Sequence, residues 1–337
     1  MYMKMTRRDF LKWMVASGVA LGMGKMDIAK AEEIINAATS TPVIWLQAAG
    51  CSGCTLSFLD MVENETADKT VSCYNAEDIL MNKIELKYHS TLMASAASEC
   101  MEVLNSEYKE SGYILVVEGG IPTGENGNYC IVGERDGKPL TAMQALKDFA
   151  VNAKYIIAAG TCSAFRGVSG AGDNLTAVKA VDQILTEYDK KIINLPGCPV
   201  HPYILGGTIV KLLLGETLEM FTDTSRTSGG DSTLMNTKRP KYFYPAVLHG
   251  ASTCPMLKFN KATTLGTCRQ CFEKIGCRGH DANTIVSCYT KLWGVDWMNK
   301  KGCLGAGSMC IGCSNPSFPF TTKTNGVATA SSIYNFK

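Results

Sequence analysis

Residues Val43 to Cys54 read Val-Ile-Trp-Leu-Gln-Ala-Ala-Gly-Cys-Ser-Gly-Cys. The apolar half of this stretch has the character of a short buried strand, and Ala49-Gly50 ends it. The turn that follows carries Cys51 and Cys54 in a Cys-x2-Cys spacing, which lets two sulfur atoms bind one metal centre from the same side. This spacing alone fits zinc, a redox dithiol or an iron–sulfur cluster, so the rest of the chain has to decide among them.

The composition is that of a folded protein with an unusual number of cysteines. The chain has 337 residues, of which 46% are hydrophobic and 19% charged, which is enough for an ordinary core. The formal net charge of +2 gives no electrostatic reason to expect a nucleic-acid partner. Fifteen cysteines are too many for a typical intracellular enzyme, and an odd number cannot all form disulfides. The last quarter of the chain holds eight of them: Cys254, Cys268, Cys271, Cys277, Cys288, Cys303, Cys310 and Cys313.

The N-terminus has the pattern of an export signal. Residues 6–12 read Thr-Arg-Arg-Asp-Phe-Leu-Lys, a twin-arginine motif, and a modestly apolar run over Trp13–Gly24 follows. That run is too short to span a membrane, and Ala29-Lys30-Ala31 fits a cleavage site with small residues. The twin-arginine route moves folded proteins that often carry cofactors, so exported cysteines need not form disulfides. We therefore assign residues 1–35 to a signal segment outside the fold, and no later run is long enough to cross a membrane.

Residues 41–215 alternate strand-like apolar runs with helical patterns, which predicts an α/β domain with a doubly wound parallel sheet. The predicted strands are Val43–Ala48, Tyr113–Glu118, Tyr155–Ala159 and Ile192–Leu195, with a weaker one at Thr70–Tyr74. The predicted helices are Leu56–Glu63, His89–Glu107, Thr141–Val151, Leu175–Tyr188 and Tyr203–Leu214.

Three of the strong strands are followed by a glycine turn that carries cysteine. Besides Cys51 and Cys54, Cys162 follows the strand at Tyr155–Ala159, and Cys198 follows the strand at Ile192–Leu195. Ligands of open parallel sheets bind outside the carboxyl ends of the strands, so these four thiols should meet at one edge. Four thiolates in such a pocket match a [4Fe–4S] cluster. Tetrahedral zinc is the alternative, although structural zinc sites usually combine two local knuckles.

Glu118 also stands at a strand end, after the second of the strong strands. We read it either as a solvated carboxylate or as a group for proton handling or partner contact beside the cluster. Cys73, Cys100 and Cys130 have no ligand-like neighbours and are read as small buried hydrophobic residues.

The C-terminal part contains two further groups of ligand residues. Residues 216–245 form a polar linker, and residues 246–337 show little periodicity, so metal centres are expected to supply much of their core. The later group is Cys288, Cys303, Cys310 and Cys313, the four thiolates of a second [4Fe–4S] cluster. The earlier group offers Cys254, Cys271 and Cys277 with either His249 or Cys268 as a fourth ligand, and spacing does not choose between these two.

With these residues placed, nearly the whole chain resembles the small subunit of a [NiFe] hydrogenase. The features that carry the resemblance are the motif at 6–12, Trp45-Leu46-Gln47 before Cys51 and Cys54, Val117-Glu118-Gly119-Gly120-Ile121-Pro122, Gly160-Thr161-Cys162, Pro196-Gly197-Cys198-Pro199, Leu248-His249, Cys271 with Cys277, and Cys310-Ile311-Gly312-Cys313.

The resemblance implies a flavodoxin-like domain with a proximal cluster, followed by an irregular, mostly helical or loop domain with a medial and a distal cluster. It implies Cys51, Cys54, Cys162 and Cys198 as proximal ligands, and it favours His249 over Cys268 at the distal cluster. Family members often have a three-iron medial cluster because proline replaces one ligand. Cys303 stands at that position here, so we expect three [4Fe–4S] clusters, with a [3Fe–4S] medial cluster only if Cys303 is not a ligand.

Two departures bear on the proximal site. Oxygen-tolerant members carry extra cysteines beside this cluster, whereas this chain has Thr55 and Gly167 at the corresponding places. Many members also have glutamate before the first cysteine, where this chain has Gly50. We therefore expect a standard proximal cluster, no special oxygen tolerance and no proton path through position 50.

The resemblance implies an electron-transferring subunit for the reaction H2 ⇌ 2H⁺ + 2e⁻, with the Ni–Fe centre in a separate large subunit. The proximal edge would face that subunit, and the distal cluster would serve an external acceptor such as a cytochrome. The expected location is the periplasm or the outer face of the cytoplasmic membrane, with membrane association through a retained signal segment or a partner. The competing hypotheses are a stand-alone polyferredoxin-like carrier and a structural zinc protein.

Overall fold

The computed structural model describes residues 41–61, 75–94, 97–107, 109–221, 237–244, 256, 259–264, 270–278, 302–305, 307–319, 322–324 and 327–329. The signal segment at 1–35, the weak strand at Thr70–Tyr74 and most of the linker lie outside these ranges. Among the described residues, no helix has the length and apolar character needed to cross a membrane.

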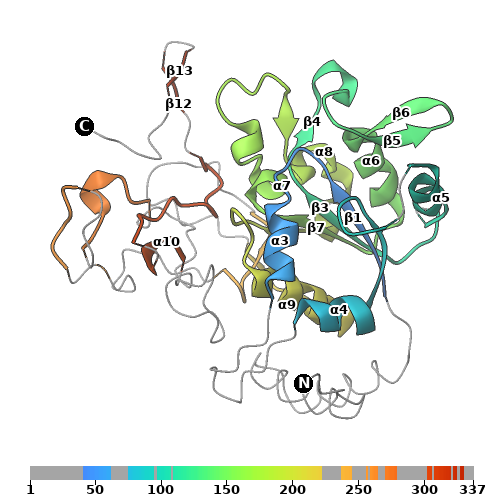
Figure 1. Cartoon of the computed structure of the whole chain (residues 1–337), viewed down its shortest axis with the longest axis horizontal. Coiled ribbons are helices and arrows are strands. Elements are labelled where there is room, and N and C mark those ends of the chain that lie inside the picture. The colour runs from blue at the N-terminus through green and yellow to red at the C-terminus, as the bar shows by residue number, and fades with distance from the viewer. Residues whose placement is uncertain are drawn as a thin grey trace.

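A five-stranded parallel sheet forms the centre of the N-terminal part (Figure 1). Its order is β2-β1-β3-β7-β9, from the strands Ile84–His89, Thr41–Gln47, Ile114–Glu118, Tyr155–Ala159 and Ile192–Leu195. Counted along the chain this is 2-1-3-4-5, the order of flavodoxin-like doubly wound sheets. The predicted α/β class is therefore confirmed.

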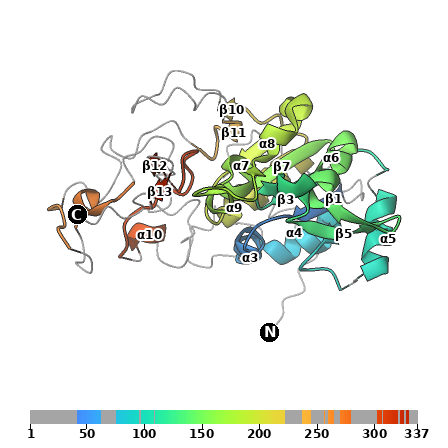
Figure 2. The same cartoon turned by 90° about the horizontal axis from the view of Figure 1, so that it is seen from above.

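Helices cover both faces of the sheet, as Figure 2 shows from above. On one face lie α3 (Gly53–Leu59), α4 (Ala76–Asn82) and α9 (Pro202–Leu213); on the other lie α5 (Ala97–Glu107), α6 (Ala142–Asn152), α7 (Thr161–Phe165) and α8 (Val181–Ile184). Strand β1 shows why both layers form. Val43 and Trp45 pack into the first core, whereas Ile44 and Leu46 pack into the second. A strand that is apolar at every position buries both faces, as parallel sheets require.

The remaining elements are short. They are β4 (Ile121–Pro122), η1 (Gly124–Gly127), β5 (Ile131–Arg135), β6 (Lys138–Thr141), η2 (Val168–Gly170), β8 (Val178–Lys179), η3 (Thr186–Lys191), β10 (Met220–Phe221), β11 (Arg239–Pro240), η5 (Glu273–Ile275), α10 (Gly302–Gly305), β12 (Thr322–Thr324) and β13 (Val327–Thr329). Strands β4 and β8, β5 and β6, β10 and β11, and β12 and β13 form antiparallel pairs.

Two sequence predictions were wrong in type or extent. The helix predicted over His89–Glu107 begins only at Ala97, as α5. His89 is instead the last residue of the edge strand β2, which was not predicted because Glu85 and Lys87 interrupt its apolar residues. The helix predicted over Leu175–Tyr188 is instead the short strand β8, the single turn α8 and the 3-10 turn η3.

The carboxyl ends of four sheet strands lie in line. Gln47 of β1 pairs with Glu118 of β3, Glu118 pairs with Ala159 of β7, and Ala159 pairs with Leu195 of β9. The segments that follow these strands therefore start at one edge of the sheet.

Candidate iron–sulfur relay site

A buried carboxylate holds the first cysteine turn against β3. Glu118 is only 2% exposed. Its Oε1 accepts from the backbone N–H groups of Cys54 and Thr55 at 3.0 and 3.2 Å, and its Oε2 accepts from Trp45 Nε1 at 3.1 Å and from Thr55 Oγ1. The two N–H groups belong to the first turn of α3, which has no intrahelical partner for them and favours a negative charge. Of the two readings of Glu118, the solvated carboxylate is wrong: the side chain is a buried structural anchor.

A buried histidine extends this network. His89 is fully buried, its Nε2 lies 3.2 Å from Thr55 Oγ1, and its Nδ1 accepts from Thr91 N at 3.2 Å. Burial lowers the pKa of His89 to about 4, so the ring is neutral at pH 7. With Nδ1 accepting, the proton sits on Nε2 and is donated to Thr55, whose own hydroxyl then donates to Glu118.

Two glycines let the neighbouring turns approach. Gly119 has φ +95°, and a Cβ there would lie 2.8 Å from the carbonyl carbon of Ala49. Gly160 has φ +85°, and a Cβ there would lie 2.4 Å from Cys54 Sγ. The thiol of Cys54 therefore fills space that only glycine leaves open at the end of β7.

The four sequence-predicted cysteines of the strand edge lie together. Burial raises the pKa of the Cys54 thiol, and the charges of Glu118, Cys162 and Cys198 raise it further. Burial likewise raises the pKa of Cys198 to about 11, with further contributions from Cys162, Cys51 and Cys303. The backbone of Val200 acts in the opposite direction and lowers the pKa of Cys54.

Three of the four cysteines of the later group also gather. Burial raises the pKa of Cys310 well above its usual value, and the charges of Cys313, Cys277 and Cys303 add to the shift. A backbone N–H group points at one of these sulfurs, because Gly312 N lies 3.4 Å from Cys310 Sγ. The fourth member, Cys288, lies outside the described residues.

Thr161 ties the strand edge to the later group. Its hydroxyl, 1% exposed, donates to the carbonyl oxygen of Cys313 and accepts from Gly197 N at 2.8 Å. Burial raises the pKa of the Cys313 thiol, and the backbone of Cys198 acts in the opposite direction and lowers it. The Thr161 hydroxyl therefore links Gly197, the residue before Cys198, to Cys313.

The earlier C-terminal group is described only in part. Cys271 and Cys277 are buried, and Arg278 N donates to the carbonyl oxygen of Cys310 at 2.7 Å, so this segment adjoins the later group. His249, Cys254 and Cys268 lie outside the described residues, and the choice between His249 and Cys268 stays open.

The cysteines outside these groups differ. Cys100 and Cys130 are half-buried with pKa values raised by burial, in keeping with small core residues, and Cys73 is not described.

The donor set fits iron–sulfur clusters better than zinc. The described cysteines form no disulfide. In the described part of the chain, no three metal-binding side chains converge on one point as a single ion requires. Zinc would draw its sulfurs to roughly 4 Å from one another, given a Zn–S bond of about 2.3 Å.

The groups that set the geometry were not among the predicted ligands. Thr161 and the hydrogen bonding of Glu118 escaped sequence reasoning, although each stands in a predicted strand-end turn next to a cysteine or glycine. The sequence signal that could have identified Glu118 and Thr161 is a polar residue at the end of a buried strand, because such a residue needs hydrogen-bond partners.

Fold and site together define a doubly wound α/β electron-transfer protein whose cysteines cluster at the sheet edge. The model of the family "NADH ubiquinone oxidoreductase, 20 Kd subunit" matches residues 51–212. The periplasmic [NiFeSe] hydrogenase small subunit of Desulfomicrobium baculatum is 32% identical, over 94% of this chain and 97% of its own length. The periplasmic [NiFe] hydrogenase small subunit of Solidesulfovibrio fructosivorans is 32% identical, over 93% and 90%.

Solved structures agree with these relatives. A chain of the H2-activated [NiFeSe] hydrogenase of Dm. baculatum superposes with a TM-score of 0.67 at 30% identity, covering 84% of this chain and 96% of that chain. The chain belongs to the family of the small subunits of [NiFe] and [NiFeSe] hydrogenases.

Replacing Glu118 by glutamine should destabilise the protein and loosen the first cysteine turn. One acceptor oxygen becomes an NH2 group that faces N–H or O–H donors, which should cost at least ~2 kcal/mol of unfolding free energy. Urea unfolding of the purified chain measures this. The matched variant Glu134→Gln changes an exposed carboxylate on β5 and should shift stability by less than about 0.5 kcal/mol. Equal effects of the two variants would refute the anchoring role of Glu118.

Thr161→Val should release the segment of Cys313 from the strand edge. Valine keeps the shape of threonine but can neither donate to Cys313 nor accept from Gly197, at a cost of about 1–3 kcal/mol. Hydrogen exchange followed by mass spectrometry should show faster exchange at residues 310–313 and 197. Thr161→Ser keeps the hydroxyl and should exchange much as the wild type does; the same rates in both variants would contradict the account.

Proposed function

We propose that this chain is the electron-relay subunit of a heterodimeric hydrogenase that catalyses H2 ⇌ 2H⁺ + 2e⁻. The observation that carries the proposal is the order of the thiols. The carbonyl oxygen of Cys313 accepts a hydrogen bond from Thr161, the residue before Cys162, and the carbonyl oxygen of Cys310 accepts one at 2.7 Å from the backbone nitrogen of Arg278, the residue after Cys277. Membership of the small-subunit family supports the same role.

The proposed ligand sets follow this order. The proximal set is Cys51, Cys54, Cys162 and Cys198; the medial set is Cys288, Cys303, Cys310 and Cys313; the distal set is His249 or Cys268 with Cys254, Cys271 and Cys277. We propose a [4Fe–4S] cluster at each, with a [3Fe–4S] centre in the medial set only if Cys303 is not a ligand. Each bound cluster supplies one-electron redox chemistry.

The described residues would serve this relay by position. Glu118 and Trp45 hold the Cys54 turn at the sheet edge, Thr161 keeps Cys313 beside Gly197, and Arg278 keeps the Cys277 segment on Cys310. The N–H group of Gly312 aimed at Cys310 would tune the reduction potential through a hydrogen bond to sulfur.

The proposed setting is a periplasmic enzyme. The catalytic Ni–Fe centre would belong to a large subunit, and a redox protein such as a cytochrome would accept the electrons. Relatives are named periplasmic, which supports export, and we assign the route to the twin-arginine motif at 6–12. The proposed division is signal segment 1–35, flavodoxin-like domain 41–215, linker 216–245 and cluster domain 246–337, with membrane association through a retained signal segment or a partner.

Purification of the tagged chain from its native host tests the function. Three four-iron clusters predict about 12 iron atoms per chain and broad visible absorbance. A nickel-containing subunit should co-purify, and the complex should reduce a dye with H2. Iron without a nickel partner would favour the stand-alone carrier, and a colourless protein with zinc would refute the cluster assignment.

Cys303→Pro should convert the medial centre from four irons to three. Cys303 lies in the first turn of α10, where proline is tolerated, so the backbone should keep its path. EPR of the oxidised protein should then show a new three-iron signal. Cys130→Ala removes a thiol outside all three sets and should leave the spectrum unchanged; an unchanged spectrum in Cys303→Pro as well would remove Cys303 from the medial set.

A further inference from the structure

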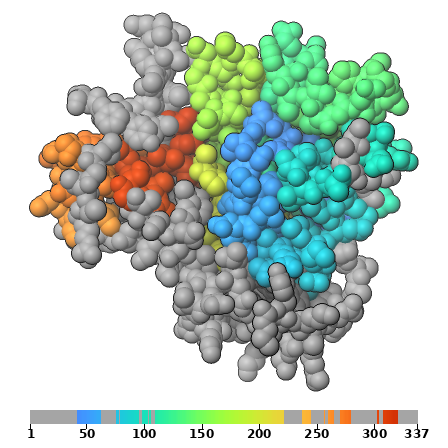
Figure 3. Space-filling view, viewed as in Figure 1, coloured from blue at the N-terminus to red at the C-terminus, as the bar shows by residue number. Residues whose placement is uncertain are grey.

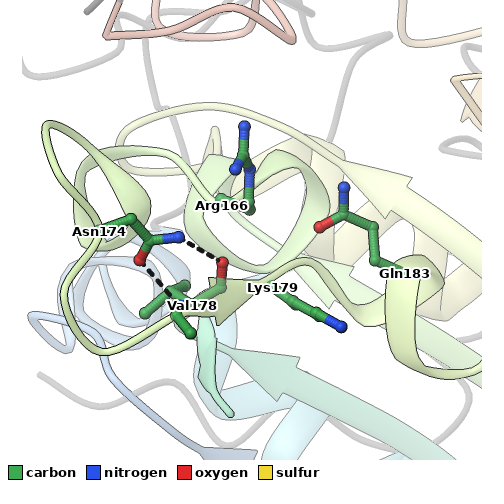
Figure 4. A pocket seen from close by; sticks show the side chains of 6 residues that line it. Arg166, Asn174, Val178, Lys179 and Gln183 are labelled. Atoms are coloured by element: carbon green, nitrogen blue, oxygen red, sulfur yellow. Dashed lines mark hydrogen bonds between the residues drawn. The ribbon is translucent and has the colours of Figure 1, made fainter. Parts of the chain in front are cut away.

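A pocket is formed by the segment that follows Cys162. It has a volume of about 460 Å³ and is lined by Arg166, Asn174, Ala177, Val178, Lys179 and Gln183 (Figure 4). We call this the Arg166 pocket. In Figure 4 the nitrogen atoms of Arg166 and Gln183 point to the same side, and Lys179 extends beneath Gln183.

The Arg166 pocket shares its walls with the proximal site. A Cβ on Gly167, the residue after Arg166, would lie 2.8 Å from the backbone nitrogen of Cys162. A Cβ on Gly120, two residues after Glu118, would lie 2.4 Å from Val178 Cγ1. Figure 3 shows the yellow-green surface that this segment belongs to beside the blue surface of residues 41–61.

The backbone around the pocket is held in a costly conformation. Arg166, Asn174 and Ala177 have φ values of +73°, +47° and +50°, a region that residues with a Cβ rarely adopt. The Asn174 side chain fixes this shape, because it accepts from Val178 N at 2.7 Å and donates to Val178 O at 3.0 Å. Backbone of this kind is concentrated at binding sites, and a preformed shape lowers the cost of association.

The segment that forms the pocket combines unpaired positive charge with exposed aliphatic side chains. Arg166 and Lys179 are exposed and make no ion pair within the described part of the chain. Val168 is 54% exposed and Leu175 87% exposed, and both lie on the segment between the two cations. A small anion would account for the cations but not for the aliphatic side chains, whereas a protein surface accounts for both.

We propose that the Arg166 pocket is a docking site for acidic side chains of the catalytic partner subunit. One or more partner carboxylates would pair with Arg166 and Lys179, while Val168 and Leu175 pack against apolar partner surface. The inference rests on the proposed function, because the proximal set has to face that subunit for electrons to enter. The charges at the rim would steer association and fix the register of the two chains.

The test compares two double charge reversals in the complete complex. Arg166→Glu with Lys179→Glu should weaken association of the subunits by about 10- to 100-fold and abolish most of its dependence on ionic strength. Lys138→Glu with Lys190→Glu changes two exposed lysines outside the pocket and should leave association near wild type. Arg166→Gln with Lys179→Gln checks that lost charge, rather than misfolding, is responsible, since it should show an intermediate loss.

The outcomes separate this inference from the proposed function. If the wild-type chain binds no nickel subunit, the proposed function fails first. If the wild type binds it and the pocket variants bind equally well with the same salt dependence, the docking site is refuted alone. Inorganic phosphate could instead stabilise the isolated chain against unfolding only when Arg166 and Lys179 are present, while the pocket variants leave association unaffected. That result would overturn the proposal in favour of a small-anion site.

Discussion

The buried carboxylate of Glu118 is the interaction on which the site depends. It receives two first-turn N–H groups of α3, an indole N–H and a hydroxyl, so a charge that would be costly in the core is fully hydrogen-bonded. Because its own backbone pairs with Gln47 on one side and Ala159 on the other, it fixes the first cysteine turn relative to the centre of the sheet. The same carboxylate positions Cys54 so that its sulfur lies against Gly160, in the turn after β7 that also carries Cys162.

Beyond this edge of the sheet, each group of cysteines lies next to the following one. Thr161 donates to the carbonyl oxygen of Cys313, and Arg278 N donates to the carbonyl oxygen of Cys310, so each group is held to its neighbour by a hydrogen bond to the main chain. A relay needs this continuity, because the rate of electron transfer between two centres falls steeply as the distance between them grows. Rigid hydrogen bonds to backbone atoms provide such fixation better than side-chain packing alone.

The sequence could predict the sheet because its strands are apolar at successive positions. Val43 to Leu46 contribute to both cores. The glycine turns after β1, β7 and β9 are the pattern from which we predict that Cys51, Cys162 and Cys198 meet at one edge of the sheet. The edge strand β2 was missed because an exposed edge carries charged residues such as Glu85 and Lys87. The segment from Leu175 to Tyr188 was misread as one helix because left-handed residues such as Ala177 have no reliable sequence signature. The roles of Glu118 and Thr161 depend on partners more than 60 and 150 residues away, respectively, which local patterns do not contain.

The central claim is that three iron–sulfur clusters form one relay through neighbouring cysteine sets. EPR of the purified wild-type protein, poised at a series of reduction potentials, tests it most directly. The account predicts several cluster signals that broaden or split when a neighbouring set is also paramagnetic, since adjacent spins interact. Cluster signals that never influence one another, or a protein with no paramagnetic iron at any potential, would contradict it.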